Sequence, residues 1–310
     1  MISIITCNYN LGHLLPKTIL SILNQNYKDL ESIIIDANSD DNSLEVIENF
    51  RQTDSRVKYL SEKDDGHFFG INKGLNICKG DIIGILNSSD IYDKNIFNLI
   101  SEEFQNDENL WILCGTNKML LKNNREINSS HSNKYMNLNN VLNFEFPAIE
   151  STFFRKEVFQ KFGNFSTDEY LKRCHTNIFL KLFSETLFMK KRIKLVNKNF
   201  SYHISHPNYR IKISRNTPTE RFYSQGRYYT SEYYLKKYEK ILNQNQRQLL
   251  SIQGEKYDLS YLLFIRQFKE FFKIEKKIYK KINIFFFIKI NFKILFNTYR
   301  AFYQYFLEKL

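Results

Sequence analysis

The feature that most constrains the fold is an alternation of short apolar runs with segments of helical periodicity, repeated about every 25–30 residues. The apolar runs are 2–6 (ISIIT), 31–35 (ESIII), 57–60 (VKYL) and 81–86 (DIIGIL). Parallel strands need a crossover connection, which is usually a helix. The alternation therefore predicts an α/β fold with a Rossmann-like, mostly parallel central sheet flanked by helices.

The segments between these runs carry apolar residues at helical spacing. Pro16 suits the first turn of a helix on which Ile19, Leu20 and Leu23 share one face. Two further sets are Leu44, Ile47 and Phe50, and Phe68, Ile71 and Leu75. Later in the chain, the pattern predicts strands over 111–121 and 151–155 and helices over 156–163 and 176–188.

Polar side chains stand at or just beyond the ends of these strands. They are Asn8, Asp36, Asp64 and Asp90. In open α/β sheets, ligands bind beyond the carboxyl ends of the strands, so we expect these four groups to meet at one ligand-binding edge. The alternative is that Asp36 and Asp64 only cap turns and helices, and that Asp90 caps a helix beginning near residue 93.

Charge divides the chain into two regions. Residues 211–310 hold 20 Lys and Arg against 8 Asp and Glu, which accounts for the whole formal charge of +12. We therefore expect one α/β domain over 1–215 and a basic, aromatic-rich helical region over 216–310. Within it, 259–310 interleaves Lys with aromatics, which favours contact with a membrane surface or packing on the first domain or a second subunit. No nucleic-acid-binding motif accompanies this charge.

The cysteines and the apolar segments indicate a compartment. Cys7, Cys78, Cys114 and Cys174 lie far apart and have no zinc-ligand spacing, so free thiols in a reducing cytosol are expected. The first apolar run is too short for a signal peptide, and no uninterrupted apolar window approaches the length of a membrane span. These features predict a cytoplasmic protein.

Four ordered motifs carry a resemblance to a known family. They are SIITCNYN at 3–10, TILSILNQNYKDLESIIIDANSDDNS at 18–43, SEKDDGHFFGINKGLNICKGDIIGILNSSD at 61–90 and STFFRKEVFQKFGNF at 151–165. Over about residues 1–205 the chain resembles the family 2 glycosyltransferases of the GT-A fold, especially bacterial enzymes that build surface polysaccharides. The resemblance implies an inverting sugar transfer, which we expect to run from a UDP-sugar to a growing surface glycan or lipid-linked oligosaccharide. Lipid-linked acceptors would place the protein peripherally at the inner face of the membrane, and an oligomer is possible.

The resemblance also implies roles for residues at the donor edge. Asp36 matches a position that contacts the nucleobase, Asp64 matches an acid that approaches base and ribose, and Lys73 lies on a helix that faces the donor. The full set expected to bind the nucleotide is Thr6, Asn8, Asp36, Asp64, Lys73 and Asn87.

The metal and the general base are where this chain departs from the family pattern. Asp90 is expected to serve a divalent metal, Mn²⁺ or Mg²⁺, or the diphosphate, but Ser89 stands where relatives supply the metal-binding carboxylate. The family's catalytic Asp falls on His175, which is a competent general base near neutral pH. Alternative acids near it are Glu150, Asp168 and Glu169.

Three other positions bear on activity. Phe69 replaces a further family acid, whereas His203 and His206 could help to neutralise the leaving group. Because three acidic positions are altered on an otherwise familiar scaffold, two hypotheses stay open. One is an enzyme with a rearranged, less metal-dependent site. The other is a catalytically degenerate relative that acts as a non-enzymatic partner in glycan assembly.

Overall fold

The computed structural model describes residues 1–120, 126–128, 134–165, 175–204, 218–253, 255 and 278. The chain forms two compact units. The first comprises Met1–Asn137, Phe146–Thr167 and Lys181–Asn208, and the second comprises Leu138–Glu145, Asp168–Leu180 and Tyr209–Leu310. Of the basic segment 259–310, only Ile278 lies within the described residues.

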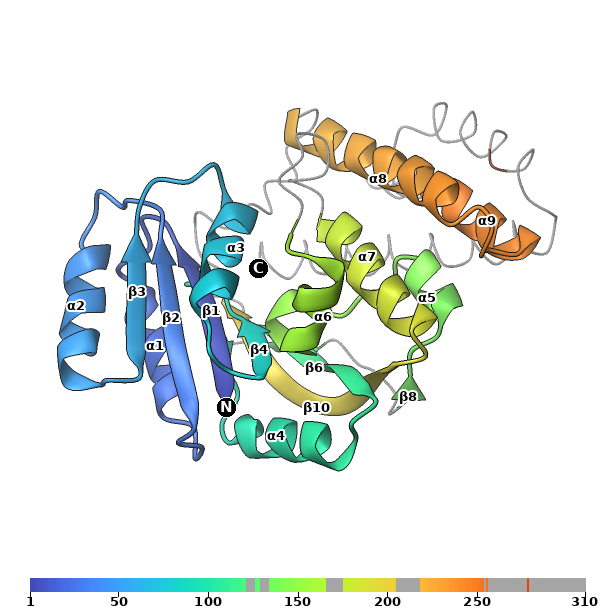
Figure 1. The fold of residues 1–310 in the computed structure, drawn as a ribbon. Coiled ribbons are helices and arrows are strands. Elements are labelled where there is room, and N and C mark those ends of the chain that lie inside the picture. The colour runs from blue at the N-terminus through green and yellow to red at the C-terminus, as the bar shows by residue number, and fades with distance from the viewer. Residues whose placement is uncertain are drawn as a thin grey trace. The chain divides into compact units, whose positions relative to one another are not determined.

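The first unit is built on one mixed sheet with the strand order β3-β2-β1-β4-β9-β6-β10-β5 (Figure 1). Its strands are β1 (Ile2–Asn8), β2 (Leu30–Asp36), β3 (Val57–Ser61), β4 (Ile82–Ile85), β5 (Ile91–Tyr92), β6 (Leu110–Leu120), β7 (Glu126–Asn128), β8 (Lys134–Tyr135), β9 (Thr152–Arg155) and β10 (Arg192–Ile204). Strands β1 to β4 pair in parallel, as the sequence predicts. Strand β9 is antiparallel to both of its neighbours.

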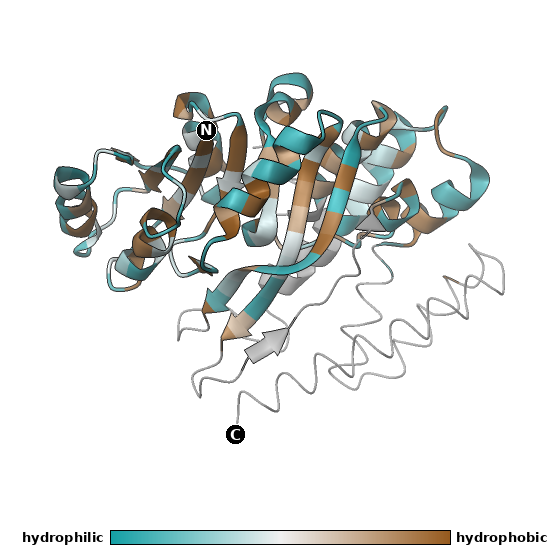
Figure 2. Ribbon diagram, turned by 90° about the horizontal axis from the view of Figure 1, so that it is seen from below, coloured by the Kyte–Doolittle hydropathy of each residue, from teal (hydrophilic) through white to brown (hydrophobic). Residues whose placement is uncertain are grey.

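The helices of the chain are α1 (Leu15–Leu23), α2 (Ser43–Thr53), α3 (His67–Ile77), α4 (Ile96–Asn106), α5 (Leu138–Leu142), α6 (Lys156–Phe162), α7 (His175–Phe188), α8 (Pro218–Lys237) and α9 (Gln244–Ser251). Alternation along the strands decides which helices they face. Ile2 and Ile4 join one buried cluster with residues of α1, α2 and α4. On β1, Ile5 points the other way and meets α3 at Gly74, where a Cβ would lie 2.4 Å from Ile5 Cγ2. Hydropathy agrees with this arrangement. In Figure 2, several strands carry apolar stretches, and the helices alternate between hydrophobic and hydrophilic residues.

Some expectations about faces and boundaries are wrong. Leu20 is 43% exposed, because α1 buries Leu15, Thr18, Ile19, Ile22 and Leu23 instead. The helix after Asp90 is α4, which begins at Ile96 with Asn95 in the N-cap position. Asp90 is six positions before that helix, so it does not cap it.

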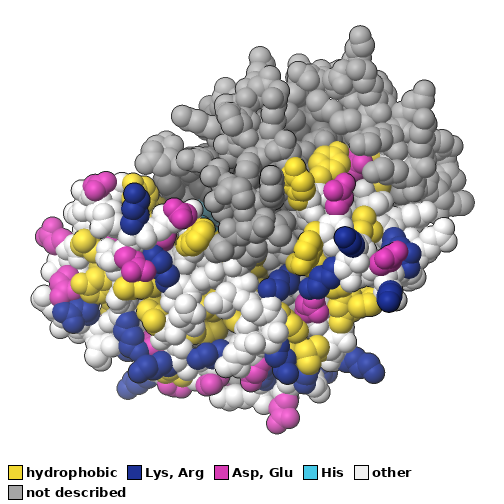
Figure 3. Space-filling model, turned by 45° about the horizontal axis from the view of Figure 1, so that its top comes forward, with side chains coloured by type: hydrophobic (Ala, Val, Ile, Leu, Met, Phe, Trp, Pro, Cys, Tyr) yellow, Lys and Arg dark blue, Asp and Glu magenta, His cyan; other side chains and the backbone are white. Residues whose placement is uncertain are grey.

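The described part of the second unit is helical. Tyr234 and Tyr238 are buried on and just beyond α8, and Asn243 and Gln246 form a reciprocal capping box at the start of α9. Among the residues that the structure describes, no helix has the length and apolarity to cross a membrane. On the face in Figure 3, the described Lys and Arg side chains lie among Asp and Glu.

Candidate active site

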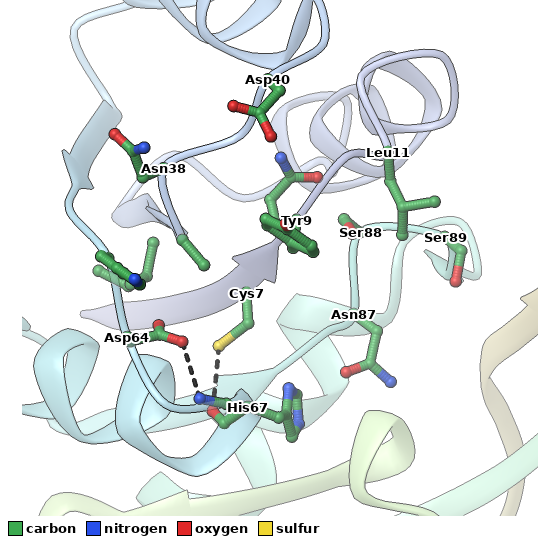
Figure 4. Close-up of a pocket in the computed structure, with 15 residues that line it drawn as sticks. Cys7, Tyr9, Leu11, Asn38, Asp40, Asp64, His67, Asn87, Ser88 and Ser89 are labelled. Carbon is green, nitrogen blue, oxygen red and sulfur yellow. Dashed lines mark hydrogen bonds between the residues drawn. The ribbon is translucent and has the colours of Figure 1, made fainter.

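A cavity of about 720 Å³ opens at the carboxyl ends of the parallel strands of the first unit. Its walls come from the loops that follow β1, β2, β3 and β4 (Figure 4). The lining residues are Cys7, Asn8, Tyr9, Leu11, Ile35, Ala37, Asn38, Asp40, Lys63, Asp64, Gly66, His67, Asn87, Ser88 and Ser89. The strand-end edge expected from the sequence is therefore a real cavity, and it is lined by three of the predicted site residues, Asn8, Asp64 and Asn87.

Asp36 is fully buried and lies behind the cavity wall. Its Oδ1 accepts hydrogen bonds from Asn8 Nδ2 at 2.8 Å and Ser39 Oγ at 2.5 Å. Its Oδ2 accepts from the Ser39 backbone amide at 3.0 Å and from Ser61 Oγ at 2.9 Å. The carboxylate thus ties the ends of β1, β2 and β3 together, so its observed contacts position the loops that line the cavity.

The loops after β1 and β2 are also tied directly to each other. The Asn10 backbone amide donates to Ser39 Oγ at 3.0 Å, and the Asp40 amide donates to Asn10 Oδ1 at 2.8 Å. Asn10 and Asn38 both adopt positive φ, at 52° and 58°, a conformation that Asn tolerates better than most residues. These links hold Tyr9 and Asp40 at the cavity.

Asp64 and Lys73 form the opposite corner of the site. Asp64 Oδ1 accepts from the Gly66 amide at 2.9 Å, which shapes the turn before α3. Lys73 Nζ lies 4.0 Å from Asp64 Oδ2 and 3.0 Å from Glu62 Oε1, and it donates to the Glu62 and Lys63 carbonyls. In the structure Lys73 therefore braces the 62–64 loop and does not line the cavity.

Two buried polar atoms on β1 have no hydrogen-bond partner within the described structure. They are Thr6 Oγ1 and Asn8 Oδ1. Thr6 is fully buried and does not line the cavity, whereas Asn8 does. An orphan buried acceptor costs free energy, so Asn8 Oδ1 is an unsatisfied polar atom directly behind the cavity surface.

The loop after β4 presents only neutral side chains to the cavity, which are Asn87, Ser88 and Ser89. Thr18 on α1 fixes its backbone by donating to the carbonyls of Ser88 at 3.0 Å and Asp90 at 2.8 Å. Asp90 itself is 0% exposed and does not line the cavity. The loop therefore turns its single acid inward.

Asp90 is engaged by two side chains inside the protein. His203 Nδ1 lies 2.7 Å from Asp90 Oδ1, and Asn87 Nδ2 donates to Asp90 Oδ2 at 3.1 Å. Burial opposes a charge on His203, but the hydrogen bond and the negative charge of Asp90 outweigh it and raise the pKa of this imidazole. The 2.7 Å contact and the raised pKa both favour a protonated His203 beside Asp90.

Glu150 joins this cluster from the short helical turn Ile149–Ser151, because Asn87 Nδ2 also donates to Glu150 Oε1 at 2.5 Å. Burial and then the charge of Asp90 raise the pKa of Glu150 to about 7. The pKa of the buried Tyr92 hydroxyl is raised as well, first by burial and then by the negative charges of Glu150 and Asp90. Perturbed carboxyl groups of this kind are typical of functional sites.

Topology explains how these distant residues meet. Strand β9 runs antiparallel to β4, so its beginning, and Glu150 just before it, lies at the carboxyl end of β4. Strand β10 pairs with β5 through Tyr202 and Ile91, which sets His203 beside Asp90. Neither pairing is visible in local sequence patterns, although His203 and Glu150 both stand out as titratable residues near predicted elements.

The remaining predicted residues are placed only in part. His175 is the first residue of α7, and its side chain lies outside the described residues, as do Asp168, Glu169 and His206. Sequence reasoning missed several cavity-lining residues, among them Tyr9, Asn38, Asp40, Lys63 and His67. The available signal was their position, since each follows a predicted strand within a few residues.

A divalent cation is implied by the fold family, and the donor set at the loop after β4 does not fit one. Among the described residues, no three His, Cys, Asp or Glu side chains are grouped as metal ligands. Asp90 is buried with both oxygens engaged, and Ser89 offers a neutral hydroxyl. Hard divalent cations prefer accessible carboxylate oxygens.

Solved structures resemble this fold. TarS of S. aureus, solved as residues 1–349 in complex with UDP-GlcNAc, matches with a TM-score of 0.63 and 13% identity, covering 91% of this chain and 81% of that one. The mannosyltransferase PcManGT from Pyrobaculum calidifontis, solved with GDP-Man and Mn²⁺, matches with a TM-score of 0.52 and 12% identity, covering 96% and 87%. Both likenesses concern the fold, which is the GT-A fold.

Sequence relatives cover a shorter stretch. The chain is 33% identical to glycosyltransferase GlyG of Streptococcus pneumoniae over 106 residues, 34% of this chain and 35% of that protein. It is 36% identical to the GalNAc(5)-diNAcBac-PP-undecaprenol beta-1,3-glucosyltransferase of Campylobacter jejuni over 91 residues, 29% of each. The match therefore spans about a third of these relatives' lengths. The sequence model described as glycosyl transferase family 2 matches residues 3–163, so the chain belongs to glycosyl transferase family 2.

Proposed function

We propose that this protein transfers a sugar, with inversion, from a UDP-sugar to a growing surface glycan or a lipid-linked oligosaccharide. The observation that carries the proposal is the cavity at the carboxyl ends of β1, β2 and β4, in a chain of this family. The UDP-GlcNAc complex of the structural neighbour TarS supports a nucleotide-sugar donor. The undecaprenol-linked substrate in the name of the Campylobacter relative supports a lipid-linked acceptor.

The nucleoside end of the donor is proposed to lie between the loops after β1, β2 and β3. Tyr9 is 58% exposed at the cavity, so its ring offers a stacking face for a base. Asn8 and Asp64 offer polar groups beside it. Asp36, Lys73 and Thr6 would act by holding these walls in place.

The reaction needs a base for the acceptor hydroxyl, whose oxygen attacks the anomeric carbon as the nucleoside diphosphate leaves from the opposite face. We keep His175 as the proposed base, because the position of the family's catalytic acid falls on it. Glu150 is the alternative among the described residues, because its carboxyl group lies directly behind the cavity-lining Asn87, at 2.5 Å from Asn87 Nδ2, and its pKa is raised to about 7. The deprotonated group would accept the hydroxyl proton while the glycosidic bond forms.

A second candidate function is a non-catalytic partner in glycan assembly that keeps a nucleotide-sugar fold. The specific observation in its favour is the inward-facing Asp90, together with Ser89, Phe69 and His175 at family acid positions. Such a protein would bind the nucleotide and release no sugar from it.

The cellular setting is proposed from the basic segment 259–310. Its interleaved Lys and aromatic side chains suit peripheral contact with the anionic inner face of a membrane, or packing in an oligomer. Deleting 259–310 should release the protein from membrane fractions, and unchanged fractionation would argue against the membrane contact.

The test of function is calorimetric binding of UDP and GDP, followed by hydrolysis of UDP-sugars with and without a lipid-linked acceptor. We expect UDP to bind in preference to GDP and sugar to be transferred or hydrolysed. Binding of UDP with no turnover of any donor would favour the non-catalytic partner. No binding of either nucleotide would overturn both functions.

A further inference from the structure

The carboxylate of Asp90 points into the protein and away from the cavity. The loop after β4 lines the cavity with Asn87, Ser88 and Ser89, whereas Asp90 has no exposed surface. The backbone that turns this acid inward is fixed from α1, because Thr18 Oγ1 donates to the carbonyls of both Ser88 and Asp90. The inward orientation is thus built into the packing of α1 against the loop.

The imidazole of His203 already occupies one oxygen of this acid. His203 Nδ1 lies 2.7 Å from Asp90 Oδ1. The pairing of Tyr202 with Ile91 fixes the register of β10 on β5, so the imidazole is held at this carboxylate by sheet geometry. A divalent cation seeking the same oxygen would have to displace the His203 side chain from it.

The second oxygen is engaged as well. Asn87 Nδ2 donates to Asp90 Oδ2 at 3.1 Å and to Glu150 Oε1 at 2.5 Å. Moving Asp90 toward the cavity would therefore strip a donor from two buried carboxyl groups. Each buried acceptor left without a partner costs roughly 1–3 kcal/mol.

The cavity wall nevertheless offers groups that suit a diphosphate. Ser88 and Ser89 bring hydroxyl donors, Asn87 brings an amide, and Lys63 brings a cation from the loop after β3. Phosphate oxygens accept readily from such donors. A diphosphate can therefore be held here by direct hydrogen bonds and one lysine.

We propose that His203 takes, on Asp90, the place of the divalent cation, and that the cavity binds its nucleoside diphosphate without a metal. The proposal rests on the function proposed above, because it concerns the same donor site. It makes His203 a positioning residue, which fixes Asp90 and through Asn87 the wall that faces the diphosphate.

The deciding experiment is the affinity of the full-length protein for UDP, measured by calorimetry in Mn²⁺ and in EDTA. We expect the two dissociation constants to agree within about twofold. An affinity that rises about tenfold or more with Mn²⁺ would overturn the metal-free site while leaving the proposed function intact. No UDP binding in either medium would overturn the proposed function, and this proposal with it.

A double variant tests the same proposal by creating a response to Mn²⁺ that the wild type should lack. In Ser89→Asp/His203→Ala, the acid is released and a second carboxylate is added beside it, so UDP should bind at least about tenfold more tightly with Mn²⁺ than in EDTA. Ser89→Asp alone should stay insensitive to Mn²⁺, because His203 still holds Asp90. A double variant that melts like the wild type and ignores Mn²⁺ would contradict the assignment. If it does not fold, the wild-type comparison decides alone.

Discussion

Asn87 donates a hydrogen bond to Glu150 across 2.5 Å, although the two residues are 63 positions apart in the chain. The same amide nitrogen lies 3.1 Å from Asp90 Oδ2. One carboxamide at the cavity wall thus bridges two carboxyl groups behind it, and it links the cavity to the interior of the sheet.

Replacing Asn87 with Ala should destabilise the protein by roughly 1–3 kcal/mol, because Asp90 and Glu150 each lose a buried hydrogen-bond donor. Urea denaturation of the variant and the wild type measures the difference. Asn49→Ala is the matched control on the exposed side of α2 and should change stability by less than about 0.5 kcal/mol. Equal stability of wild type and Asn87→Ala would show that the bridge contributes nothing.

Glu150 should make stability depend on pH. Its pKa is raised from 4.5 to about 7 by burial and by Asp90, so the folded protein keeps a proton that the unfolded chain releases. Stability from this group is complete below pH 4.5 and is lost as the pH rises to about 7. The raised pKa of His203 adds a loss in the same direction above 6.5. The unfolding free energy of wild type minus that of Glu150→Gln should therefore fall across this window.

Urea titrations at several pH values between the two limits measure that difference. His203, Asp90, Asn87 and Tyr92 surround the substituted group in both proteins. Subtracting the variant from the wild type therefore isolates the effect of the Glu150 carboxyl group. A difference that stays constant with pH would mean that Glu150 titrates normally in the folded state.

Substitutions of Asp36 and Asp40 should have different effects, because Asp36 holds the loops together and Asp40 faces the cavity. Asp36→Ala removes the acceptor for Asn8, Ser39 and Ser61 and should cost roughly 2–4 kcal/mol, with UDP binding lost through the collapsed loops. Asp40 is exposed and lines the cavity, so Asp40→Ala should leave stability within about 0.5 kcal/mol and change UDP affinity. Thermal melts and calorimetry on both variants check this, and a stable Asp36→Ala protein would contradict it.

His175 should be needed for turnover and not for donor binding. If it is the base, His175→Ala should lower sugar transfer by about 10²-fold or more while UDP affinity stays near wild type. Glu150→Gln, assayed in parallel, should keep most of its activity. The opposite pattern, with His175→Ala as fast as wild type and Glu150→Gln inactive, would assign the base to Glu150.

The local parts of this fold could be predicted from the sequence. Apolar runs ending in polar residues located β1, β2 and β4 and the edge where the cavity lies. The direction of the side chains at that edge could not be predicted. The in–out alternation of a strand, which decides the face on which each side chain lies, ends where the strand ends. The sequence marked Asp36 as a strand-end acid, but it gave no indication that the carboxylate is bonded to Asn8, Ser39 and Ser61.

Strand pairing between distant parts of the chain also could not be predicted from the sequence. His203 reaches Asp90 only because β10 pairs with β5, and Glu150 reaches Asn87 only because β9 inserts beside β4. Both contacts depend on strand partners far away in the chain, for which a single sequence carries no local signal. The same reason explains why Leu20 was placed on the wrong face, since its neighbours on the sheet decide which face of α1 is covered.

The insertion of β9 between β4 and β6 also sets an order of events during synthesis. The first 90 residues contain the loop with Asp90, but the sheet beside β4 stays open until residues 152–155 have been made. The ion pair with His203 must wait still longer, for β10. A ribosome-bound chain therefore carries most of the cavity-forming half while Asp90 still lacks its histidine partner, and closing that half is a late, non-local step in folding.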